Sequence, residues 1–297
     1  MDLAQQTPTR PLGRTGIAVS ALGTGTNRWR QGDNDAAVAE TYKALLDGGA
    51  DFIDTAEVYG FGKSERLIGD CIAADGRRAV VATKFAPFIG RTSARQLMGA
   101  LDASLERLKL TAVDLYYVHF PFPFTDMATF ADGLAEAVKS GKAKAVGVSN
   151  FSAAQMREIA ERLAKADVPL AANEVHYSLL NRKPETNGVL DACRELGVAL
   201  VAYFPLASGR LTRQPDPAKP GKLDELQRKL GEIAAAHQAK QSQVALNWLL
   251  ARDACVIPIP GASKARHAED NLAALSWTLT ADEFATLDAA AAAVQSA

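Results

Sequence analysis

Four ionisable side chains stand at or just beyond the ends of short apolar runs in this sequence. Asp54 ends the run "DFID" and Tyr59 follows five residues later, while Lys84 ends "AVVATK" and His119 ends "VDLYYVH". A phenol, with a reference pKa of about 10, gives up its proton near neutrality only where a nearby cation stabilises the phenolate. A lysine in a partly desolvated pocket keeps its charge only beside a carboxylate. Together, these residue types suit the transfer of a proton to a developing alkoxide.

Each of these side chains has a distinct candidate role. Tyr59 is the candidate proton donor, Lys84 the cation that assists it, and Asp54 the anion that keeps the lysine charged. His119 is placed to hydrogen-bond a substrate oxygen or to relay the proton. Taken singly, they have ordinary structural explanations, as a turn cap, a loop aromatic, a surface lysine and a core histidine. Their joint position at the ends of the runs favours a shared site.

The runs belong to a pattern in which eight short apolar segments alternate with segments of helical spacing. The apolar segments are residues 19–25, 51–54, 79–84, 113–119, 144–150, 170–177, 198–203 and 255–261. Eight such units predict an α/β fold, a parallel (β/α)8 TIM barrel that forms a single domain over residues 1–297. After strand seven, an extra loop and helix from residue 204 onward could form a lid over the site. A further helix ends the chain. Working side chains in such barrels lie at the carboxyl ends of the strands, where all four ionisable residues fall.

A doubly wound sheet is the competing fold for alternating strands and helices. It would carry a Gly-x-Gly-x-x-Gly motif after its first strand to hold a dinucleotide. The corresponding stretch here reads "LGTGTNRW", with Gly23 and Gly25 but no third glycine. The two glycines are interpreted as a turn where the backbone approaches a ligand, and the barrel is favoured.

The composition indicates the kind of partner. A net charge of -1 over 297 residues and a pI near 6.4 give no reason to expect nucleic acid or a membrane, so we expect a small-molecule substrate. Cys71, Cys193 and Cys255 lack the spacing of metal ligands, so no metal is expected and the thiols are interpreted as reduced. No secretory signal or membrane-spanning run stands out. The expectation is a cytoplasmic protein, either a monomer or a weak oligomer.

Five motifs, in order along the whole chain, resemble those of the aldo-keto reductases. They are "DTAEVYG", "VATK", "VDLYYVH", "GVSN" and "PIPGAS". The resemblance implies an oxidoreductase that reduces an aldehyde or ketone to an alcohol with hydride from NADPH, NAD being less expected. It makes Asp54, Tyr59, Lys84 and His119 the catalytic tetrad, with Tyr59 as the acid in reduction. The overall pattern is similar to the branch that contains pyridoxal reductases and broad carbonyl reductases.

The same resemblance implies a cofactor extended across the barrel mouth. Ser149, Asn150 and Glu174 would hold the nicotinamide carboxamide, and Tyr203 would stack on the ring. The other implied cofactor contacts are Gly25, Asn27, Leu206, Ser208, Gly209, Leu211, Gly261, Ser263, Lys264, His267, Asp270 and Asn271. Many family members have glutamine at the position of Glu174, and glutamine or arginine at that of His267.

Aromatic residues in the loops after strands one to four are candidates for the wall of the substrate pocket. They are Trp29, Phe61, Phe85, Phe120 and Phe122, with Phe124 beside them. An aromatic wall favours a flat or cyclic carbonyl compound. Packing between loops is an equally good explanation for any one of these residues.

Two other functions stay open at this point. One is a lyase barrel in which Lys84 forms a Schiff base with a carbonyl substrate, which borohydride would trap. The other is a nicotinamide-binding regulatory subunit with weak turnover. The intact set of four ionisable residues argues against the regulatory subunit.

Overall fold

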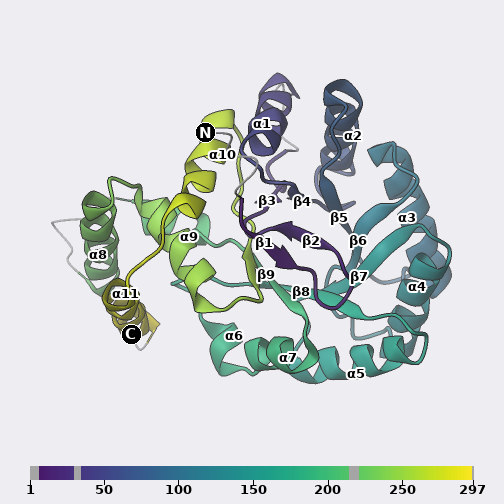
Figure 1. Cartoon of the computed structure of the whole chain (residues 1–297). Helices are drawn as coiled ribbons and strands as arrows, with labels where there is room; N and C mark the ends of the chain where they lie inside the picture. The colour runs from purple at the N-terminus through teal and green to yellow at the C-terminus, as the bar shows by residue number, and fades with distance from the viewer. Residues whose placement is uncertain (1–6, 30–34, 214–220, 296–297) are drawn as a thin grey trace.

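The protein folds as a ring of parallel strands enclosed by helices (Figure 1). The computed structural model describes residues 7–29, 35–213 and 221–295. Within these ranges, eight parallel strands form one sheet in chain order. The strands are β3 (Thr24–Gly25), β4 (Phe52–Asp54), β5 (Val80–Phe85), β6 (Val113–Val118), β7 (Ala143–Ser149), β8 (Leu170–His176), β9 (Ala199–Tyr203) and β10 (Val256–Pro258). A parallel bridge between Gly25 and Gly261 joins the first strand to the last, which confirms the (β/α)8 barrel.

Helices follow the strands and pack around the barrel. They are α1 (Asp35–Asp47), α2 (Lys63–Asp75), α3 (Ala94–Leu108), α4 (Met127–Lys139), α5 (Ala153–Ala164), α7 (Val189–Leu196), α9 (Gln241–Arg252) and α10 (Ala265–Leu272). In α3, Leu97, Leu101 and Leu105 recur at helical spacing and are buried, so one face of the helix packs inward. The hydroxyl of Ser93 caps the start of α3 by accepting a hydrogen bond from the backbone N–H of Gln96.

The predicted first strand, residues 19–25, is wrong as a single element. The structure divides it between β2 (Ala18–Ser20) and β3, with a bend between them. β2 pairs antiparallel with β1 (Thr9–Pro11), and this hairpin lies across one end of the barrel (Figure 1). Leu12 and Val19 are fully buried among the side chains of the barrel interior. The hairpin therefore closes the end of the barrel opposite the carboxyl ends of the strands.

Two of the segments of helical spacing, residues 185–197 and 265–275, are divided in the structure. The segment from residue 185 to 197 is divided between the end of α6 (Lys183–Thr186) and all of α7. Between the two helices, Gly188 takes a left-handed conformation with φ 80°, which interrupts the helix. After α10, the chain tightens into the 3₁₀ helix η3 (Ala273–Ser276). Both interruptions lie outside the barrel strands and leave the order of the parallel sheet unchanged.

The elements expected outside the eight units are present. The 3₁₀ helix η2 (Ala207–Thr212) follows β9, and the extra helix α8 (Lys222–Ala236) comes before α9. Residues 214–220 of the predicted lid loop lie outside the described residues. The last helix, α11 (Ala281–Gln295), lies beside α8 at one side of the barrel (Figure 1).

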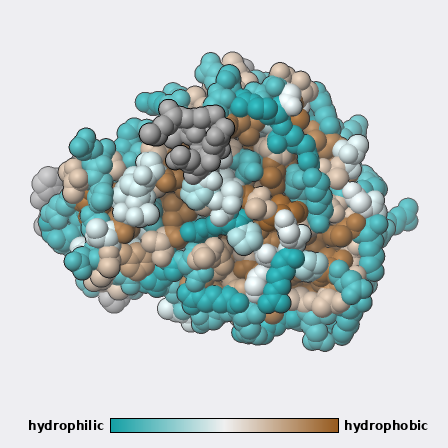
Figure 2. Space-filling model, viewed as in Figure 1, coloured by the Kyte–Doolittle hydropathy of each residue, from teal (hydrophilic) through white to brown (hydrophobic). Residues whose placement is uncertain are grey.

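The outer surface and the interior differ in character. Figure 2 shows hydrophilic residues along most of the outline and more hydrophobic ones nearer the middle of this view. Inside the barrel, Phe52, Leu115 and Tyr117 pack among alanines and valines from neighbouring strands. No helix among the described residues is long and apolar enough to cross a bilayer.

Candidate active site

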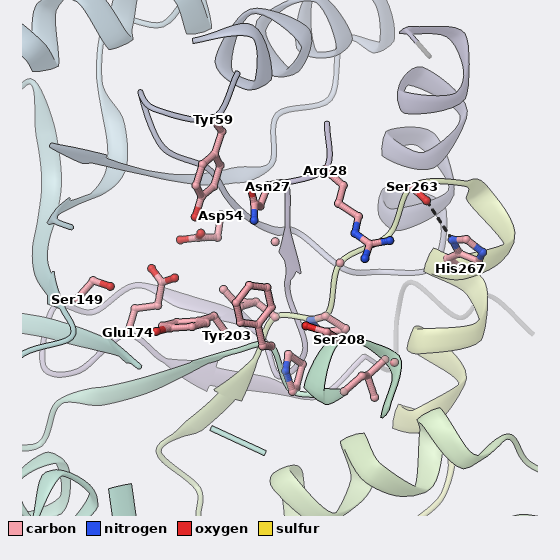
Figure 3. Close-up of a pocket in the computed structure, with 18 of the residues that line it drawn as sticks. Asn27, Arg28, Asp54, Tyr59, Ser149, Glu174, Tyr203, Ser208, Ser263 and His267 are labelled. Carbon is pink, nitrogen blue, oxygen red and sulfur yellow. Dashed lines mark hydrogen bonds between the residues drawn. The ribbon is translucent and has the colours of Figure 1, made fainter. Parts of the chain in front are cut away.

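A cavity of about 500 Å³ opens at the carboxyl end of the barrel strands. Asp54 at the end of β4, Tyr59 in the loop after it and His119 directly after β6 line this cavity. Figure 3 shows Tyr59 pointing toward Asp54, with Ser149 and Glu174 close by. The predicted gathering of ionisable groups at one rim is therefore present in the structure.

Lys84 lies just beneath the cavity, among the side chains that line it. Its side chain is fully buried, and its Nζ forms an ion pair with Asp54 Oδ1 and donates a hydrogen bond to the carbonyl of Thr55 at 2.8 Å. The same Nζ lies 3.1 Å from Glu174 Oε2 and 5.3 Å from the centre of the Tyr59 ring. Lys84 thus contacts two carboxylates and the candidate proton donor at once.

Burial and charge together set the protonation of this cluster. Burial alone would lower the pKa of Lys84, but the charges of Asp54 and Glu174 outweigh it, so its pKa is raised and the ammonium keeps its proton. Burial raises the pKa of Asp54, against the pull of Lys84. Burial and the nearby charge of Asp54 raise the pKa of Glu174 to about 8, although Lys84 opposes both. The sequence-based interpretation assigned Glu174 to the cofactor alone and missed its contact with Lys84.

The two remaining members of the cluster are held in their neutral forms. Burial raises the pKa of Tyr59, and Lys84 lowers it by less, so the phenol keeps its proton at neutral pH. Lys84 lowers the pKa of Tyr59 as expected, but the opposing effect of burial on this pKa is larger. Burial and the charge of Lys84 lower the pKa of His119 to about 3, which leaves the imidazole neutral. The His119 ring lies edge-on to Tyr59, with 6.0 Å between the ring centres.

Most of the predicted cofactor contacts line the same cavity. They are Gly25, Asn27, Ser149, Asn150, Glu174, Tyr203, Leu206, Ser208, Gly209, Gly261, Ser263 and His267. The Tyr203 hydroxyl donates a hydrogen bond to Asn150 Oδ1 at 2.9 Å. The ring of His176 stacks on Tyr203 with 5.4 Å between centres, which fixes the orientation of the tyrosine ring.

The cavity has two chemically distinct ends. Tyr59, Glu174 and Ser149 lie at one end in Figure 3, and Arg28, Ser263 and His267 lie at the other. A contact of 3.4 Å joins Ser263 Oγ and His267 Nδ1. The second end carries the groups suited to a phosphate or a nucleoside.

Four predicted cofactor contacts do not line the cavity. Leu211 is fully buried in the hydrophobic core, and Asp270 forms an ion pair of 2.5 Å with Lys240. Asn271 is buried, and its amide nitrogen makes no hydrogen bond among the described residues. Lys264 precedes α10 as its N-cap residue.

The predicted aromatic wall is wrong for two of its members. Trp29 is 2% exposed and donates its indole N–H to the carbonyl of Ala262, and Phe85 is 1% exposed beneath the guanidinium of Arg91. Phe85 is the last residue of β5 and Trp29 lies in the turn after β3, and the rings of both belong to the hydrophobic core.

The other aromatic residues lie in the loops after β4 and β6, outside the set that lines the cavity. Phe120 lies against His119, with 5.7 Å between ring centres. Phe122 packs edge-on against Phe124 at 5.5 Å, while Phe61 is 96% exposed. These residues form an apolar border beside the candidate proton donor, not a closed wall.

Several lining residues were missed by the sequence interpretation. They are Arg28, Phe204, Pro205, Ile259 and Pro260. Each lies within two positions in the sequence of a residue that was identified. Arg28, Phe204 and Pro205 would have been found by extending a motif by one or two residues, while Ile259 and Pro260 lie within the predicted run 255–261.

Comparison with known proteins assigns this barrel to the oxidoreductases. A family model described as the aldo/keto reductase family matches residues 21–292. The chain therefore belongs to the aldo/keto reductase family, which confirms the resemblance carried by its five motifs.

Similar proteins cover nearly the whole chain. Pyridoxal reductase, chloroplastic, of Arabidopsis thaliana is 34% identical over 310 residues, covering 93% of this chain and 84% of the relative. A solved thermostable aldo-keto reductase in complex with the inhibitor epalrestat has a TM-score of 0.82 at 34% identity, covering 95% of this chain and 99% of that one. An aldo/keto reductase from Klebsiella pneumoniae in complex with NADP and acetate has a TM-score of 0.82 at 27% identity, covering 94% of each chain.

Proposed function

We propose that this protein is an NADPH-dependent reductase of aldehydes or ketones, with Tyr59 as the proton donor. The observation that carries the proposal is the position of Tyr59 on the cavity, beside His119 and with the ammonium of Lys84 5.3 Å from its ring centre. Family membership supports the reaction class. A solved relative that holds NADP supports the cofactor.

Each residue of the cluster has a defined task in this reaction. When bound, the cofactor supplies the hydride that the carbonyl carbon receives. Tyr59 donates its proton to the carbonyl oxygen as negative charge develops there. Lys84 stabilises the resulting phenolate, and Asp54 keeps Lys84 charged and in place. Neutral His119 lines the cavity and hydrogen-bonds the same oxygen through a ring nitrogen.

The residues present fit a dinucleotide of this kind. Ser149, Asn150 and Glu174 offer polar atoms for the carboxamide, and the ring of Tyr203 offers a stacking surface. Gly261 lines the cavity, and a β-carbon there would meet the Gly25 carbonyl oxygen at 3.7 Å, so the glycine leaves room for a ligand to approach the backbone closely. At the far end, the Arg28 guanidinium and Ser263 suit a 2′-phosphate, which supports NADP over NAD.

The border of the cavity suggests an apolar or aromatic carbonyl compound as the substrate. Phe120, Phe122 and Phe124 supply apolar surface beside His119. Pyridoxal is one such aromatic aldehyde, and a relative named as a pyridoxal reductase supports testing it first.

A Schiff-base lyase is disfavoured by the state of Lys84. An amine nucleophile must be unprotonated and accessible to the substrate. Lys84 is fully buried, and the charges of two carboxylates overcome the effect of burial and raise its pKa.

The test of the proposed function replaces Tyr59 with phenylalanine. NADPH consumption is followed with pyridoxal, 4-nitrobenzaldehyde and cyclic ketones, and NADPH binding is measured separately by fluorescence. Tyr59→Phe should lower kcat by about 10²- to 10⁴-fold, because general acid catalysis contributes that much, while NADPH still binds.

Tyr42→Phe is a suitable control. This substitution also removes one buried hydroxyl, which donates a hydrogen bond to the Arg77 carbonyl. Tyr42, however, lies in α1 and not at the cavity. Its kcat should match that of the native protein. Unchanged turnover in Tyr59→Phe would exclude Tyr59 as the proton donor, and failure of the native protein to bind NADPH would exclude the cofactor.

A further inference from the structure

The cluster around Lys84 contains one more carboxylate than the single ammonium can balance. Lys84, Asp54 and Glu174 are 0%, 1% and 3% exposed. If all three were ionised, the cluster would carry a net charge of -1 with almost no access to water. A buried charge without compensation is strongly disfavoured, so this arrangement calls for one more proton.

The hydrogen bonding of the two carboxyl groups indicates where that proton belongs. Asp54 Oδ1 contacts the ammonium, but Asp54 Oδ2 is buried without a hydrogen-bond partner among the described residues. Glu174 Oε2 lies 3.1 Å from Lys84 Nζ in a geometry that makes no hydrogen bond, and it too is buried without one. A carboxylic acid supplies a donor that a carboxylate lacks, so a single proton on this pair relieves the shortage.

We propose that Asp54 and Glu174 share one proton beside Lys84, and that this proton leaves to solvent when the oxidised form of the nicotinamide cofactor binds. The inference rests on the proposed cofactor. It makes Glu174 a positioning residue that sets the preference between the two redox forms. A glutamine at this position would hold a carboxamide equally well but could not exchange the proton.

The link between the proton and the cofactor is electrostatic. Glu174 faces the cavity beside Ser149, Asn150 and Tyr203, the groups suited to the nicotinamide end. The oxidised nicotinamide ring carries a positive charge and the reduced ring is neutral. Ionised Glu174 therefore attracts the oxidised form and gains little from the reduced form. By thermodynamic reciprocity, binding of the oxidised form favours loss of the proton.

The other titratable groups near Glu174 keep one charge state over the neutral range. They come from β5, β6, β9 and the loops after β4 and β6, and they are Lys84, Tyr117, Tyr203, Tyr59 and His119. The pKa values of the three tyrosines and the lysine are raised, and that of His119 is lowered to about 3. Only the Asp54–Glu174 pair of this group is left to titrate near neutral pH, and its titration belongs to the two residues jointly.

The decisive measurement is the ratio of the dissociation constants of NADP⁺ and NADPH as a function of pH. Both forms carry the same phosphates and adenosine, so titration at the far end of the cavity, His267 included, cancels in the ratio. In the native protein, we expect the ratio to fall about tenfold between about pH 6.5 and pH 8.5, in favour of NADP⁺, as the pair loses its proton. In Glu174→Gln, the ratio should stay flat at the value of the native protein at low pH.

Glu57→Gln is the matched control. Glu57 is also a carboxylate of this rim, but it forms an ion pair with Arg91 and accepts a hydrogen bond from the Ala86 N–H. The Glu57→Gln variant should show the same pH dependence of the ratio of dissociation constants as the native protein. A merely structural role for Glu174 would weaken both redox forms equally and leave the slope of the ratio unchanged.

A second measurement uses only the native protein. Binding of NADP⁺ in weakly buffered solution at about pH 7.5 should release a fraction of a proton, and binding of NADPH should release less. Equal release for both forms, or a flat ratio in the native protein, would overturn the inference while leaving the proposed function intact. If neither form binds, it is the proposed function that fails.

Discussion

Replacement of Lys84 by methionine would separate the charge of this residue from its bulk. Methionine fills a similar volume without the ammonium, so Asp54 and Glu174 would stay buried with no cation. Breaking a buried ion pair by removing one partner costs about 3–5 kcal/mol. We expect the free energy of unfolding of Lys84→Met to fall by about that amount at about pH 8.

The loss should shrink as the pH falls. Without Lys84, both carboxyl groups have folded-state pKa values above their unfolded ones, so the folded variant binds protons that the unfolded chain does not. Stability then rises as the pH drops. The native cluster holds at most one such proton in this range and the variant holds two, so the difference between them should narrow by at least about 1.4 kcal/mol per pH unit. Roughly 3 kcal/mol should be recovered between about pH 8 and pH 6.

Urea unfolding followed by tryptophan fluorescence at the two pH values measures this directly. Lys109→Met is the control, because Lys109 pairs with Asp70 on the surface, where an ion pair contributes about 1 kcal/mol or less. The double variant Lys84→Met/Glu174→Gln leaves only one carboxylate without a cation and should lose less than Lys84→Met. A loss in Lys84→Met that is the same at both pH values would refute the electrostatic argument and assign the effect to packing.

Two other substitutions test separate features of the site. Trp29→Phe removes the donor to the Ala262 carbonyl and should lower the free energy of unfolding by about 1–3 kcal/mol in urea titrations; a changed KM for the carbonyl substrate would contradict the burial of Trp29. His119→Asn tests the lowered pKa of His119. The unfolded histidine binds a proton below about pH 6.5 and the folded one does not, so the native protein should lose on the order of 2 kcal/mol relative to the variant between about pH 7.5 and pH 5. Equal acid sensitivity of the two in urea titrations would show that His119 titrates normally.

The sequence predicted the barrel and its rim because both depend on local patterns. Polar residues at the ends of β4, β5 and β6 must meet on one face once the strands are parallel, so Asp54 and Lys84 could be paired without coordinates. The contact between Lys84 and Glu174 could not be predicted in this way. It joins β5 to β8 across the barrel interior, and no sequence spacing gives that separation.

Side-chain direction and bends in the chain also could not be predicted from the sequence. Trp29 is an aromatic residue of the kind that lines pockets, but in the turn after β3 its side chain is directed into the core. Hydrophobicity alone does not distinguish a pocket residue from a core residue. The division of residues 19–25 was hidden because apolar residues continue through the bend. At Gly23, just after the bend, a β-carbon would lie 2.7 Å from the ring of Phe52, so the chain passes too close to β4 for a larger residue.

The closure of the barrel also affects how the chain resists opening. β3, with two residues, is the shortest strand of the ring. It is joined to β10 and the residues after it by the bridge between Gly25 and Gly261 and by a hydrogen bond from the Gly23 N–H to the Pro258 carbonyl, although the two strands lie at opposite ends of the chain. The cavity extends over both sides of this junction. A ligand that touches both sides therefore holds the first and last strands together. When the ligand leaves, this junction is where hydrogen exchange and proteolysis of the folded barrel should begin.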